Sequence, residues 1–257
     1  MNEKTPTAEL PHRRPLVPSL TAAVITTRGR RETNQDRVCA LRTLVGGTPA
    51  VLLAVADGIG GLPAGEQAAE LALQVVGHYA HYVIPEVGGG PLAIRDALGD
   101  LVRAAGRRIW LWARDQHLAG GAGSTLVCAL VWDHRYVVAH AGDSRCYLVD
   151  GGGVRALTRD HAEATRLTNA LGWPTDLVVD LVPPDGPVGA LDGDCVVLVS
   201  SDGLHSAVGE DDMSAAFHGT RGVDEACRRL VARAVDRGST DNVSIAAVEV
   251  GHLPRSA

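Results

Sequence analysis

The chain has 257 residues, of which 46% are hydrophobic and 21% charged, a balance typical of globular proteins and not of disordered or fibrous ones. Its formal net charge of -6 argues against sequence-independent nucleic-acid binding, which requires a basic surface. No apolar run is long enough for a transmembrane helix, and no apolar segment follows Met1 as in a secretory signal. We therefore expect a cytoplasmic protein without a membrane span.

The first 20 residues differ in composition from the rest of the chain. They contain four prolines, scattered charges and few apolar residues, which predicts a flexible Pro-rich tail over residues 1–20. We expect one folded domain over residues 21–251 and a second short tail over residues 252–257.

The predicted elements follow each other in groups of strands and groups of helices. In chain order they are strands at 21–27, 37–45 and 50–56, helices at 64–82 and 91–117, three or four short strands between 124 and 157, a short helix at 160–172, strands at 177–182 and 195–200, helices at 210–217 and 222–237, and a strand at 243–250. This order favours an α+β domain with antiparallel sheets covered by helices over a doubly wound parallel sheet.

Aspartates stand at the ends of several predicted strands. Asp57 and Asp202 each follow an apolar strand and precede a glycine, while Asp241 directly precedes the last strand. Asp143 lies between two strands, and Asp36 precedes the second one. Each of these positions alone is typical of an ordinary turn. Together they would gather carboxylates at one edge of the sheets, and such a cluster favours hard cations such as Mg²⁺ or Mn²⁺.

This residue set predicts a reaction class. Two divalent cations can share a water molecule, lower its pKa and direct it at a phosphorus atom. Arg30 and Arg31 lie in the same region of the sequence as Asp36, and an arginine offers a planar fork for phosphate oxygens. We therefore expect hydrolysis of a phosphate ester by metal-activated water.

A set of short motifs resembles a known family. In chain order they are Arg31-Glu32-Thr33-Asn34-Gln35-Asp36, Val55-Ala56-Asp57-Gly58-Ile59-Gly60-Gly61, Gly123-Ser124-Thr125, Gly142-Asp143-Ser144-Arg145, Leu157-Thr158-Arg159-Asp160-His161, Ser201-Asp202-Gly203 and Thr240-Asp241-Asn242. Over residues 21–250 the chain resembles bacterial metal-dependent serine/threonine protein phosphatases of the type 2C family. The resemblance implies a four-layer α-β-β-α sandwich of two antiparallel sheets flanked by helices.

The resemblance also implies site residues and cofactors. Asp57 would bridge two metal ions, Mn²⁺ or Mg²⁺, and the carbonyl of Gly58 would bind one of them. Asp202 and Asp241 would complete the other, and Asp143 would belong to a possible third metal site. Arg31 would bind the substrate phosphate, and Asp36 would orient water at the metals. Catalysis would thus rest on Asp36, Asp57, Asp202 and Asp241.

The chain departs from the family pattern in three places, the first being Gln35, where many members carry Glu, although Gln is also common in bacterial members. Eukaryotic members have a histidine after Asp-Gly that is proposed as general acid, whereas this chain has Ile59. A mobile flap of some twenty further residues is usual between the His161 and Gly172 motifs, and only Ala162 to Asn169 remain here. The shortened flap leaves substrate choice and the third metal open, although it does not touch the two-metal core.

Three functions are compatible with these residues. The first is hydrolysis of phosphoserine and phosphothreonine in proteins by a water that bridges two metal ions, with phosphoprotein substrates of serine/threonine kinases. The second is a catalytically weak phosphoprotein-binding or regulatory module on the same fold. The third is a hydrolase for small phosphate esters. A role near the site for His161 or His205 stays open, and Trp110 and Trp112 are expected only to pack on their helix.

Overall fold

The structure is a computed structural model, and it describes residues 19–59, 64–119, 121–164, 166–173, 176–220 and 222–251. Gly60 and Gly61, all but the last two residues of the predicted tail 1–20, and the tail 252–257 lie outside the described residues.

Two antiparallel sheets form the centre of the molecule. The first has the strand order β1-β13-β12-β6-β7, and the second has the order β10-β5-β4-β3-β2, with β11 also paired to β5. The strands of the first sheet are β1 (Leu20–Thr27), β6 (Arg145–Asp150), β7 (Gly153–Ala156), β12 (Cys195–Ser200) and β13 (Val243–Val250). Those of the second are β2 (Asp36–Val45), β3 (Thr48–Asp57), β4 (Leu126–Trp132), β5 (Arg135–Ala141), β10 (Asp180–Val182) and β11 (Gly189–Ala190).

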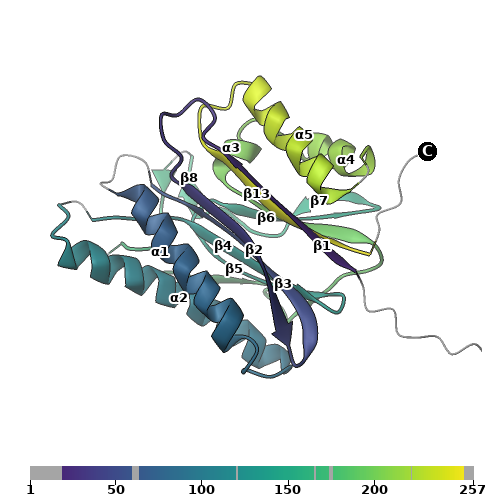
Figure 1. The fold of residues 1–257 in the computed structure, drawn as a ribbon, viewed down its shortest axis with the longest axis horizontal. Helices are drawn as coiled ribbons and strands as arrows, with labels where there is room; N and C mark the ends of the chain where they lie inside the picture. The colour runs from purple at the N-terminus through teal and green to yellow at the C-terminus, as the bar shows by residue number, and fades with distance from the viewer. Residues whose placement is uncertain are drawn as a thin grey trace, which may run out of the picture.

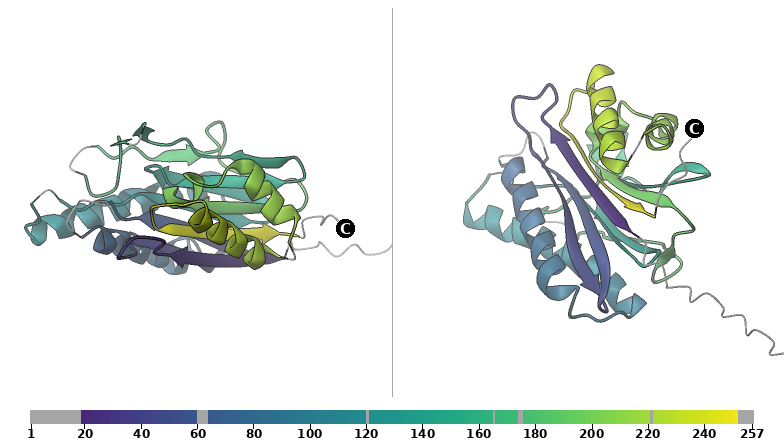
Figure 2. Two further views of the ribbon diagram at one scale, coloured as in Figure 1. Left: turned by 90° about the horizontal axis from the view of Figure 1, so that it is seen from above. Right: turned by 45° about the vertical axis from the view of Figure 1, so that its right-hand side comes forward.

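Helices cover the outer face of each sheet. On the second sheet lie α1 (Gly65–His78), its π-helical continuation η1 (Tyr79–Val83) and α2 (Pro91–Asp115). On the first sheet lie α3 (Asp202–His205), α4 (Glu210–His218) and α5 (Val223–Asp236). Figure 1 shows the two groups of helices on opposite sides of the strands, and the views of Figure 2 agree. This is the predicted four-layer α-β-β-α sandwich. Within the described ranges, none of these helices combines the length and the apolar character needed to cross a membrane.

The apolar pattern of the sequence explains the layers. Three apolar clusters fill the spaces between α1–α2 and the second sheet, between the two sheets, and between the first sheet and α3–α5. Central strands therefore bury both faces, and every residue of β4 and β13 is buried. Helix α5 instead has one apolar stripe, in which Ala226, Leu230 and Ala234 recur at helical spacing.

The predicted helix at 160–172 is wrong. This segment contains the two-residue strands β8 (Ala162–Glu163) and β9 (Arg166–Leu167), followed by extended chain. Its backbone bonds to distant residues: His161 N donates to Gly142 O at 3.0 Å, and Leu171 N donates to Ser124 O at 2.9 Å. These partners replace the bonds that a helix would make within itself. The short elements β11 and α3 were not predicted, and the predicted strand 177–182 is present only as β10.

Candidate active site

Four of the predicted aspartates converge on one cleft. Asp57, Asp143, Asp202 and Asp241 line a cleft of about 480 Å³, together with Ile59, Thr125, Arg166, Leu167 and Trp173. They come from the end of β3, the loop before β6, the start of α3 and the turn before β13. The two sheets thus supply carboxylates to one edge of the sandwich, as the sequence predicts.

Asp36 lies beneath this cleft. It pairs with Asp57 across β2 and β3 and is only 2% exposed. Its Oδ2 accepts a hydrogen bond from Ser201 Oγ at 2.8 Å, while its Oδ1 is buried without a partner in the described residues. Burial, the largest cause, and the charges of Asp202 and Asp241 raise the pKa of Asp36 to about 6.

Burial and mutual repulsion also perturb the carboxylates of the cleft. Burial is the main cause that raises the pKa of Asp57 well above its usual value, and the nearby Asp36 and Asp202 add to it. The pKa of Asp202 is raised by burial and by Asp241, and that of Asp143 is raised to about 6 by burial and by Asp202. Arg31 lowers the pKa of Asp202 and Arg145 lowers that of Asp143, but neither arginine offsets the effect of burial and of the neighbouring carboxylates.

The local chain conformation fixes these carboxylates. Thr125 N donates to Asp57 O at 2.8 Å and Asp57 N donates to Thr125 Oγ1 at 3.1 Å, while Ser124 Oγ donates to Asp57 O at 2.9 Å. Ser124 and Thr125 therefore support the site. Asp202 and Asp241 are side by side because Gly203 packs against the backbone of Asn242, where a Cβ would collide with the Asn242 carbonyl.

Arg31 lies at the rim of the cleft. Its Nη2 is 2.7 Å from Asp241 Oδ2, and its Nε donates to Thr240 O at 3.0 Å. The side chain remains half exposed. Asn242 braces this corner, since its Nδ2 donates to Arg28 O and Thr33 O and its Oδ1 accepts from Gln35 N. The arginine can therefore reach a ligand in solution while its backbone is held in place.

The Asp143 loop is held by groups outside the cleft. Arg145 forms a bidentate ion pair with Asp160, at 2.8 and 2.7 Å, and His161 N bonds to the carbonyl that precedes Asp143. His205 is partly buried, and this burial lowers its pKa to about 4. His161 and His205 are absent from the described lining of the cleft.

A second cluster, His140, His161 and Asp180, has the residue types of a metal site. The imidazole rings stack at 4.8 Å, and His161 Nε2 is 3.1 Å from Asp180 Oδ2. His161 Nδ1, however, faces two donors, Asn169 Nδ2 at 2.7 Å and Gly142 N at 3.3 Å. The ring proton of neutral His161 is therefore on Nε2, where it donates to Asp180. This arrangement favours a hydrogen-bonded network over metal ligation by His161.

Sequence reasoning missed Arg166, Leu167 and Trp173 as part of the cleft. Arg166 and Leu167 lie in the shortened flap, and Trp173 directly follows Gly172. A Cβ at Gly123 would approach Ile59 Cδ1 to 2.8 Å and Trp173 Nε1 to 3.1 Å, so these residues meet over a glycine. The only signal available was this position immediately after a motif.

Comparisons with known proteins agree with this geometry. The family model described as Protein phosphatase 2C matches residues 22–176. The chain is 28% identical over 215 residues to the serine/threonine phosphatase stp of Listeria welshimeri, with 77% of this chain and 84% of that protein covered. It is 31% identical over 235 residues to the serine/threonine protein phosphatase PstP of Mycobacterium tuberculosis, with 86% of this chain and 43% of that protein covered. The solved structure of the PstP catalytic domain, in complex with two manganese ions, is 29% identical, has a TM-score of 0.73 and covers 90% of this chain and 98% of that one.

Proposed function

Because this chain belongs to the protein phosphatase 2C family, whose members here are named serine/threonine phosphatases, we propose that it hydrolyses phosphoserine and phosphothreonine in proteins. The observation that carries this proposal is the convergence of Asp57, Asp143, Asp202 and Asp241 on one cleft beside Arg31. We propose that its substrates are proteins that serine/threonine kinases have phosphorylated.

The donor set fits Mn²⁺ or Mg²⁺. Asp202 Oδ1 and Asp36 Oδ1 are buried polar atoms without a partner in the described residues, and the neighbouring carboxylates raise each other's pKa. Carboxylate oxygens are the ligands that both cations prefer. We assign Asp57 to both of two metals, the Gly58 carbonyl to one of them, and Asp202 with Asp241 to the other. We assign Asp143, whose pKa is raised by burial and by the charge of Asp202, to a third and weaker metal site.

The side chains around the cleft have different roles in the proposed hydrolysis. Bound divalent cations lower the pKa of water and neutralise phosphate oxygens, which makes hydrolysis feasible near neutral pH. The Arg31 guanidinium binds the phosphate as a planar fork once it turns from Asp241 toward the cleft. Asp36 accepts a hydrogen bond from water through its unpartnered Oδ1 and so orients the nucleophile. Ile59 is apolar and cannot protonate the leaving alkoxide, so this proton comes from another group.

Hydrolysis of p-nitrophenyl phosphate and of a phosphothreonine peptide tests the proposal. Purified protein is assayed with Mn²⁺, with Mg²⁺ and with EDTA, and Asp202→Asn is run beside it. We expect peptide hydrolysis that requires the metal and falls at least a hundredfold in the variant. Activity on small esters alone would instead indicate a small phosphate-ester hydrolase. A folded, metal-loaded protein that binds the phosphopeptide and hydrolyses neither substrate would indicate a binding module.

A further inference from the structure

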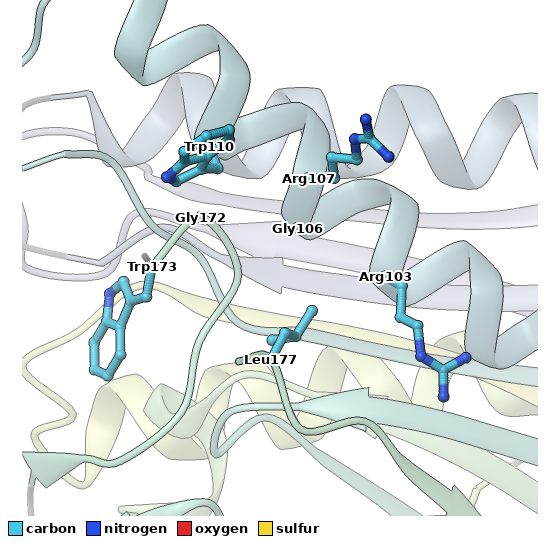
Figure 3. A pocket seen from close by; sticks show the side chains of 7 residues that line it. All are labelled: Arg103, Gly106, Arg107, Trp110, Gly172, Trp173 and Leu177. Carbon is cyan, nitrogen blue, oxygen red and sulfur yellow. The ribbon is translucent and has the colours of Figure 1, made fainter. Parts of the chain in front are cut away.

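A groove with three arginines leads away from the cleft along α2. Trp173 lines both the cleft and a neighbouring hollow of about 340 Å³, whose other walls include Arg103, Arg107 and Trp110 on α2 and Leu177 on the facing segment. Figure 3 shows these side chains on the two sides of the hollow. A second hollow, of about 500 Å³, shares Trp110 and continues past Arg114 and His117. We call these two hollows together the α2 groove.

The wall between cleft and groove is packed tightly onto α2. A Cβ at Gly106 would approach Leu177 Cδ2 to 2.8 Å, and Gly172 has a φ of +81° with the Ile109 side chain and the Ala122 carbonyl directly against it. Only glycine combines this φ with so close an approach. The segment that carries Gly172 and Trp173 is therefore held against the helix, and the groove continues from the wall of the cleft.

The charge of the groove is opposite to that of the cleft. Among the described residues that line the two hollows, none is acidic, whereas the cleft is lined by four aspartates. Arg103 and Arg114 have exposed ion pairs with Asp100 and Asp115, at 3.1 and 3.2 Å. The side chain of Arg107 is exposed and has no ion pair or hydrogen bond in the part of the chain described. A free guanidinium thus faces solvent on a protein with a net charge of -6.

The groove also offers apolar surface. Trp110 is 39% exposed and has the Arg114 guanidinium over its ring at 5.3 Å, while Trp173 and Leu177 are half buried. The sequence had predicted only packing for Trp110. From Arg103 to Arg114 the helix rises about 16 Å, which an extended peptide spans with about five residues. Aromatic surface next to arginine is a common composition of peptide-binding sites.

We infer that the α2 groove binds a segment of the phosphoprotein substrate that lies beside the phosphorylated residue and carries Asp or Glu together with an apolar side chain. The inference rests on the proposed function, and it names the substrate class for that site. Arg107 binds the acidic side chain, and Trp110 with Leu177 contacts the apolar one. The lining of the groove has arginines and no acidic residue, so an acidic side chain beside the phosphorylated residue is attracted there.

Two phosphothreonine peptides test this inference. They differ only in that flanking Asp residues of one are Asn in the other, and kcat/KM is measured for both. We expect wild-type protein to prefer the acidic peptide and Arg107→Glu to lower the ratio of the two kcat/KM values about tenfold. Arg108→Glu is the matched control, because Arg108 is the next residue of α2, is also exposed and does not line the groove. Its ratio should stay at the wild-type value.

Two results would overturn the inference. One is that the ratio of the two kcat/KM values is the same in wild type and Arg107→Glu. The other is that Arg108→Glu lowers this ratio as much as Arg107→Glu does, which would reflect only the overall charge of the protein. A change of the sedimentation coefficient in Arg107→Glu, with an unchanged ratio, would show that the groove binds a second copy of the chain.

Failure of the proposed function is separated from failure of this inference by a binding measurement. Fluorescence anisotropy of the labelled peptides in EDTA reports docking without hydrolysis. If the protein hydrolyses neither peptide, weaker binding of the acidic peptide to Arg107→Glu than to Arg108→Glu still supports the groove. Equal binding of the two peptides to wild-type protein contradicts it.

Discussion

The guanidinium of Arg31 lies 2.7 Å from Oδ2 of Asp241, although we assign these two side chains to ions of opposite charge. Both belong to long-range contacts between the segment before β2 and the turn before β13. The pair offsets part of the negative charge that Asp241 adds to the cleft. Under the assignment we propose, cations on the carboxylates would make this contact dispensable and would free Arg31 to bind phosphate.

Replacing Arg31 tests its assignment. In Arg31→Ala we expect kcat/KM for a phosphothreonine peptide to fall about a hundredfold, because a charged donor to the phosphate is lost. Arg31→Lys should recover only part of this loss, since lysine lacks the planar fork. Arg42→Ala, an exposed arginine toward the other end of β2, serves as the control. Wild-type kinetics in Arg31→Ala would remove Arg31 from the phosphate site.

Asp202→Asn should stabilise the metal-free protein and weaken its response to metal. The substitution removes one charge from a cluster in which Asp57, Asp202 and Asp241 repel each other. In EDTA we expect the melting temperature to rise by about 2–4 °C, the equivalent of about 1 kcal/mol in a chain of this size. The rise in melting temperature that Mn²⁺ causes in the wild type should be smaller in the variant. Asp224→Asn, which removes an exposed ion pair with Arg228 on α5, should give no such gain in EDTA.

The burial of His140 predicts that the folded protein loses stability in acid. Its side chain is 1% exposed, and burial lowers its pKa from 6.5 to about 4, with the neighbouring His161 acting in the same direction. The unfolded chain takes up a proton as the pH falls below 6.5, whereas the folded chain does so only near pH 4. The stability linked to His140 is thus fully present above pH 6.5 and is lost as the pH falls toward 4.

Comparing the unfolding free energy of wild type and His140→Gln at several pH values isolates the contribution of His140. Both proteins are unfolded with urea in EDTA between pH 7 and pH 5. We expect the wild type to lose about 2 kcal/mol more of its unfolding free energy than the variant over this interval. Parallel pH profiles would mean that His140 has the same pKa in the folded and the unfolded chain. Comparing differences removes the contribution of the carboxylates, which are the same in both proteins.

Gly203→Ala should damage both stability and activity. The new methyl group would collide with the carbonyl of Asn242 and push the turn that carries Asp241 away from Asp202. We expect a loss of more than about 2 kcal/mol in unfolding free energy and weaker activation by Mn²⁺. Gly77→Ala is the control, because a Cβ at Gly77 of α1 meets nothing within 4 Å and alanine favours the helix. Unchanged Mn²⁺ activation in Gly203→Ala would contradict the role given to this packing.

The sequence predicts the parts of this molecule that are set by local pattern. The strands and long helices have clear apolar periods, and Asp57, Asp202 and Asp241 are found because they adjoin such strands. The segment from 160 to 172 has no apolar period from which its structure could be predicted. Its structure depends on Gly142 and Ser124, which are distant in the chain. The contribution of Trp173 to the cleft could not be predicted for the same reason.

The placement of β13 has a consequence for how the enzyme is made. This strand, Val243–Val250, pairs with β1 on one side and with β12 on the other, so the middle of the first sheet is among the last parts of the domain to leave the ribosome. A nascent chain that ends before Asp241 lacks one of the proposed metal ligands and holds β1 and β12 as unpaired edges. Catalytic competence therefore arises only after β13 has been made, and until then these two edges are the surfaces that a chaperone has to shield.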